Sequence, residues 1–204
     1  MNRGKVIRIL PGGLLFFCML LISYRTFAQE NQVAAELSFV RGRIFINSPG
    51  KEPYEARAGL HLLPLSTSLI TMLDGQCFFK IDGAELRMKQ ETILALTGRP
   101  HYELRQGMAG FKTATGTVRL TTAHLAAEFA NAVVVVKTNP VLTRLCVVKG
   151  TVLVTQGRQS ATVSAGSEIA AAPQRLSRIY RQSDELRFTW YWVEPEKEPA
   201  LRND

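Results

Sequence analysis

Residues 59–96 have the sequence GLHLLPLSTSLITMLDGQCFFKIDGAELRMKQETILAL, and this stretch decides the fold that we predict for the chain. Apolar positions recur at every second residue in three successive runs, namely Cys77–Phe79–Ile81, Leu86–Met88 and Thr92–Leu94–Leu96. Asp74-Gly75 precedes the first run, and Asp82-Gly83 separates the first run from the second. Such alternation, broken by Asp-Gly turns, is typical of half-buried strands in tight succession. The stretch contains no reactive group, so it predicts an architecture rather than an activity.

A ten-residue pattern occurs twice in the chain, as LSFVRGRIFI at 37–46 and as LCVVKGTVLV at 145–154. In both copies the apolar alternation changes phase at a glycine, Gly42 or Gly150. We interpret this change as a bulge or bend that keeps the apolar pairs on both sides inward, Leu37 and Phe39 included. An Ala-Gly pair follows each copy. The chain therefore contains an internal two-fold repeat of strand, glycine bend, strand, turn and Ala-Gly.

The segments between the two copies also have the pattern of strands. Residues 117–122 and 133–138 are rich in threonine and valine, and another strand beginning at Tyr102 is expected to end at Gly107. Residues 123–132 are interpreted as a strand or a short turn. Since no long 3.6-residue period occurs outside the N-terminal segment, we expect a single all-β domain, sandwich-like or solenoid-like.

The chain has 204 residues and a formal net charge of +8, with 46% hydrophobic and 21% charged residues. This composition is that of a folded globular protein. Four of the basic residues precede residue 29, and residues 29–204 contain 21 basic against 17 acidic residues. The later basic residues form no stripe interleaved with aromatic ones. The charge pattern therefore disfavours nucleic-acid binding.

The first 28 residues have the composition of a secretory signal peptide. A basic segment, residues 1–8, precedes a largely apolar run at 9–23, and Thr26-Phe27-Ala28 places small residues before Gln29. We expect a signal helix that is cleaved after about Ala28, and a periplasmic or secreted protein. The alternative is an uncleaved signal that anchors the chain in the membrane. The apolar run is shorter than the roughly 20 residues that a spanning helix needs, which favours cleavage.

Two cysteines, Cys77 and Cys146, remain after the signal peptide. An oxidising compartment would permit a disulfide between them. Their places in the alternation argue the other way, because Cys77 is in phase with Phe79 and Ile81 while Cys146 is out of phase with Leu145. A Cys77–Cys146 disulfide is one prediction, and two buried or edge thiols are the alternative.

The chain changes character after residue 172. Residues 173–193 form an extension that could hold a short helix from Ser183 or a strand. Aromatic residues gather in it, and these are the candidate partner-binding residues: Phe188, Trp190, Tyr191 and Trp192. The competing interpretation is that they cover one end of the core. Residues 194–204 are charged and contain proline, and we expect them to be a disordered tail.

No pattern of catalytic or metal-ligating residues is recognisable. His61, His101 and His124 are far apart and lack a second histidine or cysteine at ligand spacing. Three acidic residues, Asp74, Asp82 and Glu85, could suggest an acid pair or a cation site, but Asp-Gly is more often a turn. We therefore expect no enzyme, no cofactor and no metal.

The ordered features resemble the FecR domain family. The residues that carry the resemblance are Gly42, Ala56, Gly59, Leu62, Ile70-Thr71, Asp74-Gly75, Asp82-Gly83, Leu86, Met88, Leu104, Gly107, Val147, Gly150, Val152, Val154 and Ala165-Gly166. The resemblance covers about residues 35–172. It implies an extracytoplasmic all-β domain of bacteria that binds other proteins. The family's usual Gly-Thr before a late strand is replaced here by Asn131-Ala132.

The resemblance predicts a FecR-like β domain at residues 29–172. Only eight residues precede the apolar N-terminal run, so we expect a stand-alone secreted domain without the cytoplasmic anti-sigma segment of full-length FecR regulators. The predicted function is a non-catalytic binding or scaffold module that contacts an envelope protein. The alternative is a glycan or peptidoglycan binder in which the C-terminal aromatic residues form a stacking platform.

Overall fold

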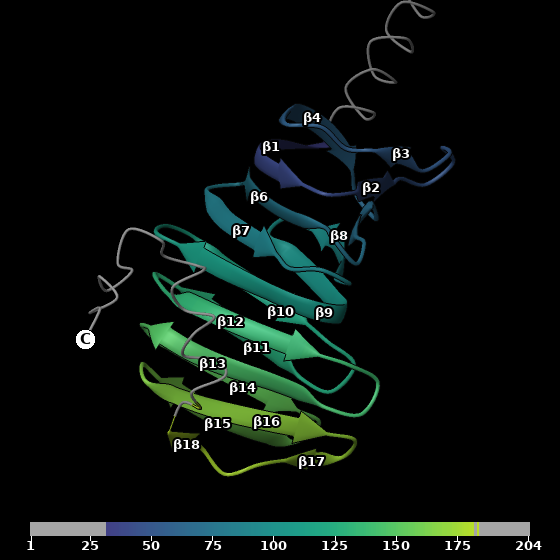
Figure 1. The fold of residues 1–204 in the computed structure, drawn as a ribbon. Coiled ribbons are helices and arrows are strands. Elements are labelled where there is room, and N and C mark those ends of the chain that lie inside the picture. The colour runs from purple at the N-terminus through teal and green to yellow at the C-terminus, as the bar shows by residue number, and fades with distance from the viewer. Residues whose placement is uncertain (1–31, 182, 184–204) are drawn as a thin grey trace, which may run out of the picture. The chain divides into compact units, whose positions relative to one another are not determined.

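The computed structural model describes residues 32–181 and 183, which form eighteen β-strands and no helix (Figure 1). The predicted all-β fold class is confirmed. In this part of the chain no helix is long and apolar enough to cross a membrane. The signal segment 1–28, the aromatic residues 188–192 and the tail 194–204 lie outside the described residues.

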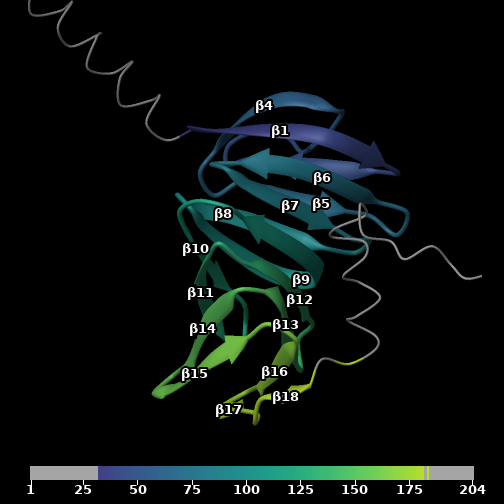
Figure 2. The ribbon, with the colours of Figure 1, turned by 90° about the vertical axis from the view of Figure 1, so that its left-hand side faces the viewer.

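Sheet A forms one layer, and its strands lie one beside the next (Figures 1 and 2). In spatial order they are β4 (Gly59–Pro64), β1 (Gln32–Arg41), β6 (Gln76–Ile81), β7 (Ala84–Met88), the second half of β9 (His101–Thr113), β12 (Val133–Thr138), β13 (Thr143–Lys149) and β16 (Ser167–Ala172). Two short strands, β17 (Arg175–Leu176) and β18 (Tyr180–Arg181), both pair with β16.

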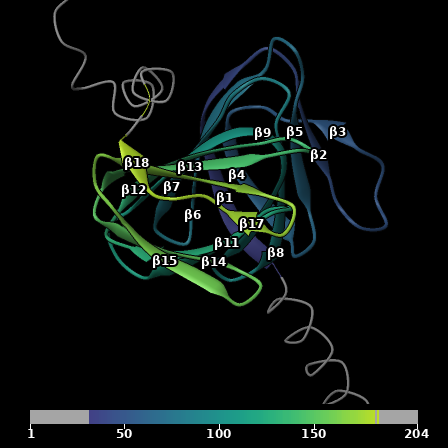
Figure 3. The same ribbon diagram turned by 90° about the horizontal axis from the view of Figure 1, so that it is seen from below.

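Sheet B forms the other layer. Its strands, again in spatial order, are β3 (Tyr54–Glu55), β2 (Ile44–Asn47), β5 (Ser68–Thr71), β8 (Ile93–Gly98), the first half of β9, β10 (Thr117–Thr121), β11 (Ala126–Ala130), β14 (Thr151–Gln156) and β15 (Gln159–Ser164). Because β9 belongs to both layers, the strands form one continuous sheet that folds into a sandwich (Figure 3). Only the β9–β10 pair is parallel among the registers of sheet B.

The core lies between the two sheets and confirms the three predicted apolar runs. All eight residues of those runs are buried. Near the middle of the core, the ring centroids of Tyr102 and Phe111 are 5.9 Å apart, and those of Phe111 and Phe129 are 6.0 Å apart. Such tilted and edge-on aromatic pairs add to the stabilisation that burial of their area provides.

The predicted glycine bends are the places where the chain passes from sheet A to sheet B. Gly42 (φ 65°) joins β1 to β2, and Gly150 (φ 83°) joins β13 to β14. Each strand pair faces the same core from opposite layers. In the second copy the apolar alternation changes phase at Gly150, whereas in the first copy it changes at the register shift between Leu37 and Phe39, so that Val40 already packs against the core before Gly42. Asn131 (φ 45°) makes the reverse passage from β11 to β12. Asparagine tolerates this left-handed conformation better than most residues.

Two local predictions were wrong. Phe39 does not face the core: a register shift between Leu37 and Phe39 turns it outward, and it stacks on Phe78 with 4.7 Å between ring centroids. The strand that begins at Tyr102 does not end at Gly107. β9 continues to Thr113, and Gly107 (φ 91°) bends it from sheet B into sheet A.

Sheet A also extends beyond residue 172, the expected end of the domain. β17 pairs with Ala171 and Ala172, and β18 pairs with Ser167 and Glu168. The first part of the C-terminal extension is therefore integrated into the sandwich.

Candidate functional site

The structure separates the two candidate cysteines, and the aromatic candidates are not among the residues that it describes. The partner-binding set Phe188, Trp190, Tyr191 and Trp192 lies outside the described residues, although Ser183, just before it, is described. Among residues 32–181 and 183, no group of three or more His, Cys, Asp or Glu side chains could hold a metal ion.

The structure contains no Cys77–Cys146 disulfide, and both thiols are free and buried. Cys77 faces the core from β6, whereas Cys146 lies on β13 with its side chain on the opposite face of sheet A, in a separate cluster. The alternative expectation, two buried thiols, is the arrangement found. Burial raises the pKa of each thiol to about 12, and the charge of Glu168 adds to the shift at Cys146. Since the thiolate is the nucleophile, neither cysteine is prepared for chemistry near neutral pH.

The three acidic candidates are turn and surface residues. Asp82 (φ 48°) and Gly83 (φ 79°) form the tight hairpin between β6 and β7, as the Asp-Gly pattern predicts. Asp74 lies in the turn from β5 to β6, where its Oδ1 accepts a hydrogen bond from the Arg43 amide at 3.4 Å. Glu85 makes an exposed ion pair with Lys112 at 3.9 Å. They therefore make no acid pair.

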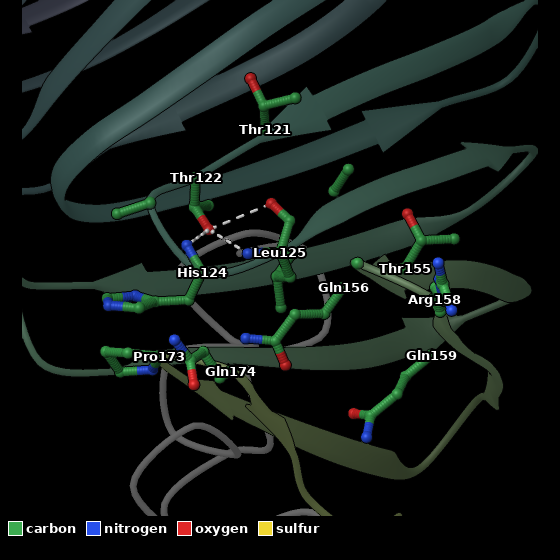
Figure 4. A pocket seen from close by; sticks show the side chains of 13 residues that line it. Thr121, Thr122, His124, Leu125, Thr155, Gln156, Arg158, Gln159, Pro173 and Gln174 are labelled. Carbon is green, nitrogen blue, oxygen red and sulfur yellow. Dashed lines mark hydrogen bonds between the residues drawn. The ribbon is translucent and has the colours of Figure 1, made fainter.

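A pocket lies at one end of sheet B, where the loops after β10, β14 and β16 meet (Figure 4). It has a volume of about 780 Å³. Its polar lining is mostly hydroxyl and amide groups, from Thr121, Thr122, Thr155, Gln156, Gln159 and Gln174, with Arg158 as the cation. These groups can hydrogen-bond a ligand, but the lining contains no carboxylate, and its histidine is already engaged.

His124, in the wall of this pocket, is buried at 7% exposure and bonded through both ring nitrogens. Nε2 lies 3.2 Å from the carbonyl oxygen of Pro140, to which it must donate, and Nδ1 lies 3.1 Å from Oγ1 of Thr143. Oγ1 of Thr143 in turn contacts the hydroxyls of Thr138 (2.7 Å) and Thr122 (3.1 Å). The network ties the β10–β11 loop to the β12–β13 loop, so His124 is structural.

We expect the substitution His124→Ala to lower the free energy of unfolding by about 2–3 kcal/mol, because it leaves the Pro140 carbonyl and the Thr143 hydroxyl without their partner. Urea denaturation followed by circular dichroism measures this loss. The matched control is His101→Ala, since His101 is only half-buried. Equal losses in the two variants would contradict the structural role of His124.

An exposed apolar strand forms a second candidate surface. β4 pairs with β1 and lies at the end of sheet A (Figure 2). Two side chains of this strand, Leu60 at 70% and Leu62 at 63% exposure, share one face, while Leu63 is buried on the other. An end strand with exposed leucines is a template for pairing with another extended chain.

The sequence contains an indication that this strand lies at an edge, but the apolar alternation alone does not reveal it. Leu60 and Leu62 alternate as core residues do, but the phase of the strand is set by Leu63, which is fully buried. Pro64 ends the strand, and proline is typical of edge strands. Pro64 could have indicated that β4 lies at an edge.

Comparisons with known proteins give a likeness of fold alone. No protein-family model and no curated protein matches the chain. One similar solved structure is a crystal structure of a "putative anti-sigma factor" from Parabacteroides distasonis ATCC 8503, with a TM-score of 0.52 and 12% identity over 62% of this chain and 64% of that one. Another of the same description has a TM-score of 0.46 and 16% identity, covering 53% of this chain and 56% of that one. The chain spans less than two thirds of the length of either structure.

Proposed function

We propose that this protein is a non-catalytic, extracytoplasmic interaction module with a FecR-like fold, and that it binds an extended segment of an envelope protein along β4. The observation that carries the proposal is the exposed leucine pair of β4 at the end of sheet A. The FecR-like pattern of glycines and strands, together with the fold likeness to the anti-sigma factor structure, supports an interaction module.

The chemistry of the partner follows from the strand. The outer backbone edge of β4 offers amide and carbonyl groups at the spacing of a sheet, so the partner segment is itself extended. Leu60 and Leu62 project from the same face about 7 Å apart, and alternate apolar residues of the partner strand would pack beside them. Burying two leucine side chains contributes roughly 3–6 kcal/mol before the costs of association.

The described residues support a binding role over an enzymatic one. Both thiols have raised pKa values, the pocket histidine is engaged through both ring nitrogens, and Asp82 forms a turn. The extracytoplasmic location is inferred from the signal-like residues 1–28. Mass analysis of the exported protein tests it, and a mature chain that begins at Gln29 is the expected result.

The binding site is tested by site-specific photocrosslinking in cells, with a crosslinking amino acid at Leu62. We expect one envelope protein to be captured through one extended segment, and the double substitution Leu60→Lys and Leu62→Lys to reduce that capture at least tenfold. The purified partner segment should then protect the β4 amides from hydrogen exchange. The matched control is Leu153→Lys, because Leu153 is 46% exposed on β14, away from β4.

Two results would overturn this function. One is capture that survives both lysine substitutions on β4. The other is retention of the purified protein on peptidoglycan or polysaccharide, without any protein partner, that is lost when Trp190 and Trp192 are replaced by alanine. The second result would support the glycan-binding alternative instead.

A further inference from the structure

The outer face of sheet A carries a second cluster of buried apolar side chains, separate from the core. Val133, Val135 and Cys146 are 0–2% exposed, and the half-buried Met108 and Val148 pack against them. Their neighbours Val134 and Leu145 face the core, so alternation points the cluster away from it. In the described part of the chain, all eighteen strands belong to the two layers, and none forms a third layer over this face.

A continuous row of paired residues leads from this cluster to the C-terminal strand. Val135 lies opposite Cys146, Cys146 opposite Glu168, and Glu168 opposite Tyr180. Glu168 is fully buried and holds the end of the described chain: its carboxylate accepts hydrogen bonds from the Tyr180 hydroxyl at 2.9 Å and from the Ser183 hydroxyl at 3.1 Å. The chain is therefore attached to the outer face of sheet A at Ser183.

The residues that follow Ser183 have the length to reach the cluster. Neighbouring strands are about 4.8 Å apart, so Val135 lies two strands, roughly 10 Å, from Glu168. Five extended residues span up to about 17 Å. Residues 184–188 therefore suffice to bring Phe188 and the tryptophans that follow it over the cluster.

The charges of the two surfaces are complementary. Residues 184–204 contain six acidic and three basic residues. Basic side chains surround the cluster on the outer face, among them Lys89, Lys137 and Arg144. Burial lowers the pKa of Lys89, and the neighbouring charge of Lys137 lowers it further, so these two ammonium groups lie close enough to repel each other.

We propose that the C-terminal segment 184–193 of this chain covers the outer face of sheet A in cis, with Phe188, Trp190 and Trp192 over Val135 and Cys146. In this arrangement the aromatic residues of the segment pack on the outer cluster of the same chain, on a surface distinct from β4. The acidic residues at its start and end meet the lysines and arginines around the cluster.

The two free thiols provide an internal test in the full-length protein. Cys146 lies under the proposed cover, whereas Cys77 lies in the core. We expect a version of the chain that ends at Ser183, and the full chain carrying Trp190→Ala and Trp192→Ala, to be alkylated by iodoacetamide at Cys146 at least roughly tenfold faster, with Cys77 unchanged. Peptide mass spectrometry measures the two sites separately. A version ending at Lys197 keeps the aromatic residues and should stay protected.

A second measurement keeps the proposal testable if either variant unfolds and exposes both thiols. Trp190 and Trp192 are the only tryptophans of the chain, so its tryptophan emission reports on this segment alone. We expect the unmodified protein to emit at shorter wavelength than in urea and to resist acrylamide quenching. If acrylamide quenches the tryptophan emission of the unmodified protein as completely as it does in urea, the proposal is overturned. It is also overturned if Cys146 stays as protected as Cys77 in a folded double variant. Protection that is lost on dilution would assign the cover to a second copy and would equally overturn it.

Discussion

The substitution Gly107→Ala is expected to lower the free energy of unfolding by about 3–4 kcal/mol, enough to unfold much of a marginally stable domain. Gly107 has φ 91° and bends β9 from one sheet into the other. A Cβ there would lie 2.4 Å from Thr92 Oγ1, 2.5 Å from Thr92 Cα and 2.6 Å from the Glu91 carbonyl oxygen. Backbone strain and overlap therefore add together. Urea denaturation measures the loss.

The matched control for this prediction is Gly116→Ala. Gly116 has a similar positive φ, 78°, but no atom lies within 4 Å of a Cβ built there. Gly116→Ala should lower the free energy of unfolding through backbone strain alone, by about 1–2 kcal/mol. The difference between the two variants isolates the close approach of β9 to Thr92. If the two losses are equal, the bend at Gly107 does not pack as described.

The substitution Glu168→Gln is expected to lower the free energy of unfolding by about 2–4 kcal/mol, because it removes the charge of a fully buried carboxylate that is paired with Arg144. The carboxylate of Glu168 accepts a hydrogen bond from Arg144 Nε at 2.6 Å, and the Arg144 side chain is itself 21% exposed. The change deprives the half-buried guanidinium of this counter-charge. It also loosens the attachment of Tyr180 and Ser183 to sheet A. Thermal and urea denaturation measure the loss of stability.

Glu103→Gln is the control for the buried pair. Glu103 and Arg105 are joined at 2.9 Å, but their side chains are 36% and 53% exposed. Water and salt screen such a pair, and its loss should cost less than about 1 kcal/mol. If Glu168→Gln lowers the free energy of unfolding no more than Glu103→Gln does, Glu168 does not hold the C-terminal strand.

The sequence predicted the strands well where alternation and turn chemistry are local. The run Cys77–Phe79–Ile81 and the Asp82-Gly83 hairpin need only neighbours in the chain, and both were correct. Phe39 was misplaced because a bulge arises from pairing with β6, which the sequence of β1 does not encode by itself. The same limit applies to Gly107, because a glycine in the sequence predicts the end of a strand and only the pairing of β9 shows that the strand continues.

The two proposed surfaces depend on information that lies far apart in the chain. Leu60 and Leu62 become an interaction surface only because β4 takes the end position in sheet A. Cys146 and Val135 become one cluster only because β12 and β13 pair with that register. Neither position nor register can be obtained from periodicity alone.

The fold class and the bends at Gly42 and Gly150 follow from the sequence, because alternation and backbone freedom are properties of neighbouring residues. The tertiary structure alone decided which strands became neighbours. It therefore decided that Cys77 and Cys146 lie on opposite faces of sheet A, that Glu168 is buried against the end of the described chain, and that β4 is left at an edge, because these facts follow from pairing between residues distant in sequence.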